Sequence, residues 1–206
     1  MLNRNSLKLF ALMSTLMLLL MTVGSAAAIT DGELDGNNHP AVVLILMEVN
    51  NVPAFRCSGT LISPTVVLTA GHCTNGFPNE VFSGMRVFTE SDVQNGDNNY
   101  PFTGPNSVEA VSWASHPLYE TAPFVVHDVG VIVLAEPINL TSGQYGVLPT
   151  VNQLDALKTK RGLQNVTFTS VGYGLQESFP NAAAWKENNV RVRMVAHPHL
   201  LQINVP

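Results

Sequence analysis

The chain has 206 residues and a formal net charge of −5, and 46% of its residues are hydrophobic while only 12% are charged. This hydrophobic fraction excludes a disordered tail or linker, and the length allows one large domain or two small ones around a buried core. No block of Lys or Arg is present, which argues against a nucleic-acid partner.

The first 28 residues have the layout of a secretory signal peptide. Two basic residues, Arg4 and Lys8, precede an apolar run that ends at Val23, and small residues up to Ala28 follow. A membrane anchor is the alternative interpretation, because the apolar run holds no charge. Cleavage after Ala28 would make Ile29 the mature N-terminus and leave eight basic against fifteen acidic residues, a net charge of −7. We therefore expect a secreted protein that does not stay in the membrane after cleavage.

The rest of the chain is predicted to be all-β. Short runs rich in Val, Ile, Leu, Thr and aromatic residues are separated by Gly, Pro, Asn and Asp, which indicates a barrel or a sandwich. The clearest predicted strands are Ala41–Val49, Arg56–Ile62, Thr65–Ala70, Met85–Thr89, Val108–Trp113, Val129–Ala135, Val166–Val171 and Val190–Ala196. Strict alternation from Val190 to Met194 predicts one wet face and one buried face there. Weaker patterns suggest a helical turn at Ala70–Cys73 and a short helix at Gln153–Lys160.

Only two cysteines are present, Cys57 and Cys73. In an exported protein a pair of this kind usually forms a disulfide, and two free thiols are the alternative. The bond would close a loop of about 15 residues and contribute about 3 kcal/mol in the chain-entropy model.

Two residues have the chemistry of a catalytic pair. His72 ends an apolar run and adjoins Cys73, so the disulfide would fix the turn that carries it. Asp128 opens an apolar strand, where a carboxylate is costly unless it is paired, and a histidine would be a suitable partner. Taken alone, each has a structural alternative: a packing histidine, and an aspartate that caps a turn.

Together these segments resemble the trypsin-like, chymotrypsin-fold serine endopeptidases. Thr69-Ala70-Gly71-His72-Cys73 is similar to the family's Thr-Ala-Ala-His-Cys box, and Asp128-Val129-Gly130-Val131-Ile132 to its Asp-Ile-Ala-Leu-Leu box. His116-Pro117-Leu118-Tyr119 is similar to a His-Pro-x-Tyr segment between them, and Val171-Gly172-Tyr173-Gly174 to a strand end of the second barrel. The spacing of the two cysteines matches the family's disulfide at the histidine loop.

The resemblance implies two antiparallel β-barrels with an active site between them. We expect residues 29–149 to form the first barrel and a linker, and residues 150–206 to form an incomplete second barrel. His72 would be the general base, Asp128 would orient it, and Ile29 would be the family's mature aliphatic N-terminus. The expected partners are protein or peptide substrates. Neither a cofactor nor a metal ion is expected, since phosphate-binding loops are absent and no further ligand accompanies His197 and His199.

One departure from the family is serious. The catalytic serine lies in a Gly-Asp-Ser-Gly-Gly-Pro box in this family, and no Gly-x-Ser-x-Gly of any kind occurs in the 206 residues. The last serine, Ser178, has no such context. We therefore expect a protease truncated before its serine box. A secreted pseudoprotease that serves as a binding module, and a chain completed by a separate polypeptide, are the alternatives.

Overall fold

A computed structural model describes residues 32–76, 81–119, 126–153, 166–174, 176 and 190–200. The signal segment, Ile29, Ser178 and most of the predicted helix at 153–160 lie outside these residues. Within them the secondary structure consists of nine strands and one short helix. The elements are β1 (Glu33–Leu34), β2 (Val42–Val49), β3 (Val52–Ser63), β4 (Val66–Thr69), α2 (His72–Asn75), β5 (Phe82–Phe88), β6 (Ser107–Ser115), β7 (Gly130–Leu134), β8 (Ser170–Gly172) and β9 (Met194–Ala196).

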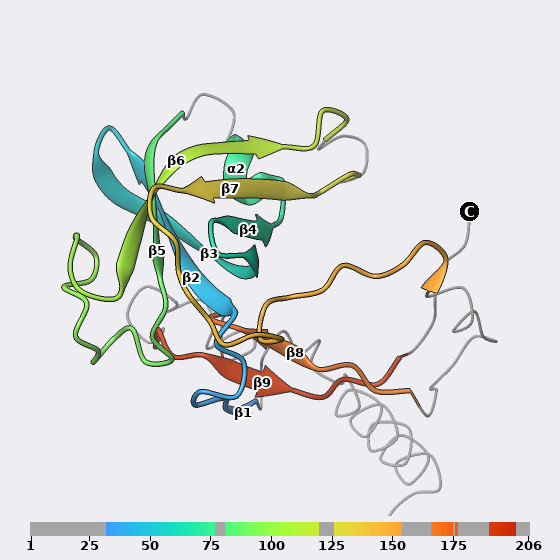
Figure 1. Ribbon diagram of the computed structural model, residues 1–206. Helices are drawn as coiled ribbons and strands as arrows, with labels where there is room; N and C mark the ends of the chain where they lie inside the picture. Colours follow the sequence, from blue (N-terminus) through green and yellow to red (C-terminus); the bar gives the residue numbers. More distant parts are fainter. Residues whose placement is uncertain are drawn as a thin grey trace, which may run out of the picture.

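Six strands close into an antiparallel barrel in the order β2-β3-β4-β7-β6-β5. Figure 1 shows this barrel above a smaller sheet, which has the order β1-β9-β8. The all-β prediction and the complete six-stranded barrel are therefore confirmed. Among the described residues, no helix is long and apolar enough to cross a membrane.

Strand β2 is buried on both faces, which explains its continuous apolar sequence. Val43, Ile45 and Met47 point into the barrel core, where Leu61, Val67 and Ile132 join them. The alternate side chains of Leu44 and Leu46 belong to a second buried cluster with Phe88, Val93 and Tyr173. Because successive side chains of a strand point to opposite faces, a strand that serves two cores needs apolar residues at nearly every position.

The smaller sheet differs from the prediction in its extent. The strands expected at Val166–Val171 and Val190–Ala196 contain only short ladders, β8 and β9, and Val192 contributes an isolated bridge to Asp92. β1 was not predicted, and it pairs with β9 through Glu33 and Val195. A strand of two residues has too little alternation to be recognised in a sequence.

The alternation around Arg193 did not indicate which face is buried. Arg193 has no exposed surface, while Val190 is exposed. The guanidinium is satisfied because its Nε donates to Asp35 Oδ2 at 2.8 Å, and its NH1 and NH2 donate to the carbonyls of Val42 and Gly36. A buried charge is tolerated when it is both paired and hydrogen-bonded.

Candidate active site

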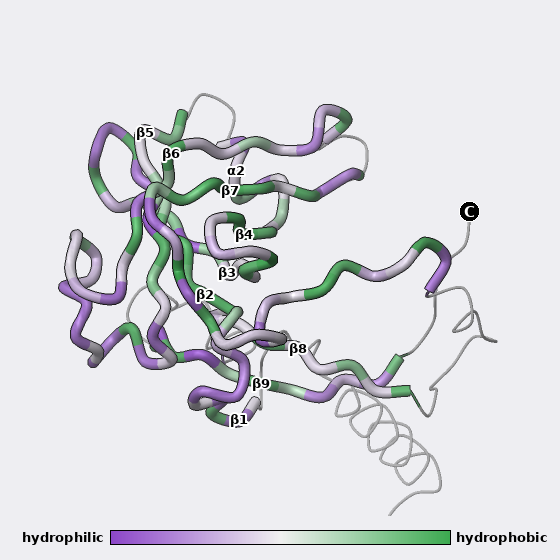
Figure 2. Tube along the Cα trace, in the orientation of Figure 1, coloured by the Kyte–Doolittle hydropathy of each residue, from purple (hydrophilic) through white to green (hydrophobic). Residues whose placement is uncertain are grey.

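The pairing of two strands brings the histidine and aspartate segments together. β4 and β7 are antiparallel neighbours, and Thr69 at the end of β4 lies opposite Gly130 at the start of β7. The chain that leaves β4 and the chain that enters β7 therefore meet at the same rim of the barrel. His72 lies three residues after Thr69, and Asp128 lies two residues before Gly130. Figure 2 shows β7 in the hydrophobic colour and the segment that precedes it in the hydrophilic colour.

Both oxygens of Asp128 accept hydrogen bonds from His72. The backbone N–H of His72 donates to Oδ1 at 2.8 Å, and Nδ1 of the ring lies 2.9 Å from Oδ2. A carboxylate in this position stabilises the tautomer with the proton on Nδ1, which leaves Nε2 as the basic nitrogen. The His72 side chain is 55% exposed, so this nitrogen can be reached by a reacting group.

Asp128 stays ionised for a physical reason. Partial burial alone would raise the pKa of Asp128, but the hydrogen bonds from the backbone and side chain of His72 and from the backbone of Gly71 outweigh it and lower that pKa. Burial, together with the negative charge of Asp128, raises the pKa of Tyr119. At neutral pH the site therefore combines a fixed carboxylate with a neutral phenol.

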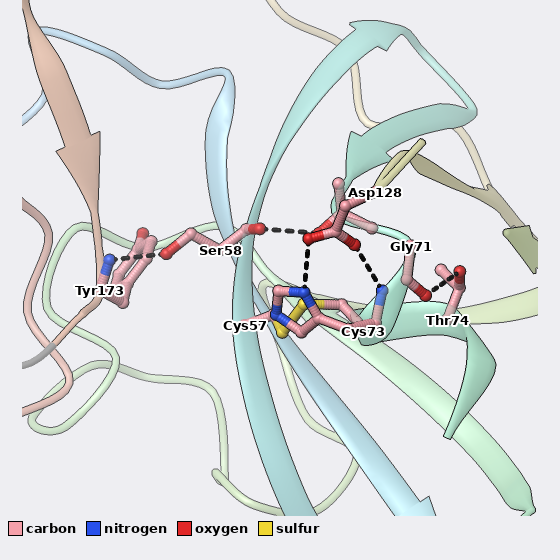
Figure 3. Close-up of a disulfide and its surroundings, with 9 residues drawn as sticks. Cys57, Ser58, Gly71, Cys73, Thr74, Asp128 and Tyr173 are labelled. Atoms are coloured by element: carbon pink, nitrogen blue, oxygen red, sulfur yellow. Dashed lines mark hydrogen bonds and ion pairs between the residues drawn. A yellow bond between two sulfur atoms is a disulfide. The ribbon is translucent and has the colours of Figure 1, made fainter. Parts of the chain in front are cut away.

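The disulfide between Cys57 and Cys73 is present, with a Cα–Cα distance of 6.3 Å. It ties β3 to α2 one residue after His72. A second tie joins β3 to β4, because the Thr69 hydroxyl donates to the Ser58 carbonyl at 2.9 Å. Figure 3 shows the disulfide close to Asp128, with Ser58 and Tyr173 to one side of both. These two cross-links hold the turn that carries His72 on a rigid strand.

The sequence analysis missed a contact between the barrel and the smaller sheet beside this site. The backbone N–H of Tyr173 donates to Ser58 Oγ at 2.8 Å, and the Tyr173 hydroxyl donates to the Glu90 carbonyl at 2.6 Å. Burial raises the pKa of Tyr173 to about 12. Because Ser58 and Tyr173 are 115 positions apart, no local pattern could have paired them.

A second missed feature is the conformation that aims Asp128. His127 has a positive φ of 51°, and its carbonyl accepts a bond from the Val129 N–H at 2.7 Å. Its ring stacks on His116, with centroids 5.0 Å apart and planes inclined by 11°. A positive φ is uncommon for a residue other than glycine, and histidine is among those that adopt it more often. The only local indication of this conformation in the sequence is that a histidine, His127, directly precedes Asp128.

The only histidine and cysteine cluster with metal-ligand spacing in the described part of the chain is formed by Cys57, His72 and Cys73, whose ligand atoms lie within 4.8 Å of one another. Both sulfur atoms are used in the disulfide. A metal is bound by thiolates, so this cluster is not a metal site while the bond is intact.

Known proteins are similar to this chain in sequence and in structure. Phenoloxidase-activating factor 3 of Holotrichia diomphalia is 30% identical over 115 residues, which is 52% of this chain and 32% of that protein. The solved structure of HL collagenase superimposes with a TM-score of 0.58 at 19% identity, covering 83% of this chain and 63% of that one. The chain thus spans about a third of the length of this curated relative.

The family comparison covers most of the chain. Residues 32–196 match the sequence profile of the family described as Trypsin. This span includes the closed barrel, the smaller sheet and the pair formed by His72 and Asp128. The chain belongs to the trypsin family of serine proteases.

Proposed function

We propose that the chain is the His- and Asp-bearing part of a secreted, trypsin-like serine endopeptidase. The observation that carries the proposal is the pair of hydrogen bonds from His72 to Asp128, one from the backbone and one from Nδ1. His72 is proposed as the general base and then the general acid, and Asp128 as the residue that orients it.

The geometry supports this division of work. When Nδ1 holds its proton against Asp128, Nε2 can accept the proton of an attacking hydroxyl and later return it to the leaving amine. The imidazolium formed between these steps is stabilised by the Asp128 carboxylate 2.9 Å away. Asp128 takes no proton itself, since hydrogen bonding holds the pKa of its carboxyl below the usual range.

His72 and Asp128 provide neither the nucleophile nor the oxyanion hole that peptide hydrolysis requires. No serine of the 206 residues lies in a Gly-x-Ser-x-Gly context. Nucleophilic attack and stabilisation of the oxyanion each contribute large factors to the rate, so His72 and Asp128 alone are not expected to hydrolyse peptides. We propose residues 29–149 as the first barrel with its linker, and residues 150–206 as part of the second barrel.

Secretion is proposed from the N-terminal segment and from the disulfide. Residues 1–28 have the three-part layout of a signal peptide, and cleavage after Ala28 would expose Ile29. Disulfides persist in oxidising compartments, and the bond between Cys57 and Cys73 fits export.

The test begins with the coding sequence that follows Pro206. We expect a Gly-Asp-Ser-Gly-Gly segment in one of the reading frames, and a protein extended through it should react with a fluorophosphonate probe. His72→Ala in the extended protein should lower the rate of labelling at least a hundredfold, as loss of a general base does. His199→Ala removes an exposed histidine elsewhere and should leave the rate unchanged. Equal labelling of the His72→Ala variant and the parent would refute the proposal.

A binding module on the same scaffold is the second candidate, favoured by the lack of a serine box in the sequence. It requires that no reading frame contains the box and that the secreted chain is a folded monomer. It also predicts that His72→Ala leaves recognition of its partner intact.

A further inference from the structure

Two arginines lie near one tyrosine beside the barrel. Arg56 lies on β3, Tyr100 lies in the loop between β5 and β6, and Arg191 precedes β9. The Arg191 guanidinium carbon lies 5.2 Å from the centre of the Tyr100 ring, which is within cation–π distance. The half-buried Arg56 side chain lies near enough to Tyr100 for the Tyr100 hydroxyl to raise the pKa of Arg56, although burial lowers that pKa overall. The ring itself is held by an edge contact with Phe88, with centroids 5.0 Å apart.

These two arginines lack the carboxylate partners that the other described arginines have. Arg86 is paired with Glu48 and Glu109, and Arg193 is paired with Asp35. Neither Arg56 nor Arg191 forms an ion pair with a carboxylate among the described residues. Burial, and to a smaller extent the positive charge of Arg191, lowers the pKa of the Arg56 guanidinium. Two like charges near each other repel, and an anion bound between them removes that repulsion.

The hydrogen-bonding capacity of Arg191 is also incompletely used. NH1 donates to Gln94 Oε1 at 2.8 Å, while the buried Nε has no acceptor within the described part of the molecule. A buried donor without a partner is costly, so a shift of this side chain that lets Nε reach an incoming oxygen atom gains more than the same contact at a satisfied donor. The planar guanidinium fork suits the two oxygens of a carboxylate.

The covalent path from Arg56 to His72 is short. Arg56 is bonded to Cys57, Cys57 is cross-linked to Cys73, and Cys73 adjoins His72. The Cα–Cα distance is 6.3 Å across the disulfide and about 3.8 Å across each of the two peptide bonds. The Cα atoms of Arg56 and His72 are therefore within about 14 Å, which an extended peptide crosses in about four residues.

From this arrangement we infer that Arg56 and Arg191, both near Tyr100, form a subsite for an acidic side chain of a peptide that passes His72. The inference rests on the proposed function for the identity of its ligand, a peptide substrate. The subsite binds Asp or Glu a few residues from the bond that would be cleaved. The subsite supplies two positively charged guanidinium groups, and contacts with Tyr100 hold them in position.

The test measures binding and needs no hydrolysis. Short capped peptides share one sequence except at a single position, which carries Asp, Asn or Lys. Further sets place this variable position elsewhere along the peptide. The affinity of each peptide for the full chain is measured by fluorescence anisotropy at low ionic strength. We expect the Asp peptide to bind about tenfold more tightly than the Asn peptide at one position, the effect of one charge-assisted hydrogen bond. High salt should reduce the difference.

Variants separate the subsite from general electrostatics. Arg56→Gln and Arg191→Gln should each reduce the preference for Asp to less than threefold, as expected when one charge-assisted hydrogen bond is lost. Ser112→Asp shifts the net charge by the same one unit at an exposed position of β6 and should leave it intact. Arg56→Glu should reverse the preference toward the Lys peptide, a result that loss of folding does not give, and Arg191→Glu serves if the first variant does not fold.

The outcome is separable from that of the proposed function. His72→Ala should keep the preference for Asp, so a failure of catalysis leaves this result standing. The inference is wrong if the Asp and Asn peptides bind equally at every position, if neither binds measurably, or if Ser112→Asp lowers the preference as much as Arg56→Gln does.

Discussion

Nε of Arg193 donates a hydrogen bond to Oδ2 of Asp35 over 2.8 Å, and neither residue has solvent-exposed surface. The bond links the segment after β1 to the segment before β9, which are 158 positions apart in the chain. Asp35 also accepts bonds from the ring and the backbone N–H of His39. One buried carboxylate therefore connects the N-terminal segment to the smaller sheet.

Removal of one partner of this pair should destabilise the fold strongly. Arg193→Met leaves Asp35 buried without its cation and should lower the free energy of unfolding by about 3–5 kcal/mol. The double variant Asp35→Leu, Arg193→Met should lose much less than the sum of the two single variants. Urea denaturation followed by circular dichroism measures both. The exposed Glu33→Gln is the control, expected to change stability by less than about 0.5 kcal/mol, and a single-variant loss as small as this would contradict the role of the pair.

Acid should weaken the same connection. Burial alone would raise the pKa of Asp35, but hydrogen bonds from His39 and Arg193 and the charge of Arg193 lower it below its usual range. The carboxylate then contributes stability that is complete above the unfolded-state pKa of about 3.9 and is lost as the pH falls through the lower folded-state value. The melting temperature of the parent should fall more steeply below about pH 5 than that of Asp35→Asn. Parallel curves for the two proteins would show that another group controls the acid response.

The disulfide should be present in secreted material and should stabilise it. Intact mass should increase on alkylation only after reduction, at Cys57 and Cys73 alone. The free energy of unfolding should fall by about 3 kcal/mol in the variant with both cysteines replaced by serine, the value that the chain-entropy model gives for a loop of about 15 residues. Thiols that alkylate without a reductant would contradict the bond.

The chain of 206 residues should not react as a serine hydrolase. Asp128 can orient His72 as a proton acceptor, but no serine of the chain lies in a Gly-x-Ser-x-Gly context. A fluorophosphonate probe should label no residue, and peptide substrates should survive incubation. Covalent labelling of any serine would reveal a nucleophile that the sequence patterns do not show.

N-terminal sequencing of secreted protein tests the proposed processing. Small residues at Ala26 and Ala28 are suitable for signal peptidase, so the mature chain should begin at Ile29. Any other first residue refutes this cleavage site. A variant with a bulky residue at position 28 should be processed more slowly or elsewhere.

The features that local sequence could predict were those carried by short segments. Strand β2 was recognisable because both of its faces are buried and its apolar run is continuous. His72 and Asp128 were recognisable because each stands beside distinctive neighbours, Cys73 in one case and the apolar strand β7 in the other. Their proximity then follows from one strand pairing, β4 with β7.

The features that the sequence did not indicate depend on partners far away in the chain. Alternation predicted one wet and one buried face for the segment that holds Arg193, but not that the arginine is on the buried face, because a charged side chain is normally exposed unless something satisfies it. Its partner Asp35 lies 158 positions away and gave no local signal. The bond between Ser58 and Tyr173 and the burial of Tyr173 have the same origin. Long-range polar contacts form only when two segments have already been brought together by apolar packing.

The position of β1 has a consequence for how the protein is made. Every strand of the closed barrel lies between Val42 and Leu134, so the barrel can close while the rest of the nascent chain is still being synthesised. β1 pairs with β9, and Glu33 lies opposite Val195. At 5–20 residues per second, the partner of Glu33 follows it by roughly 10 to 30 seconds. The first of the described strands is therefore among the last to be paired, and chaperones can bind it during that delay.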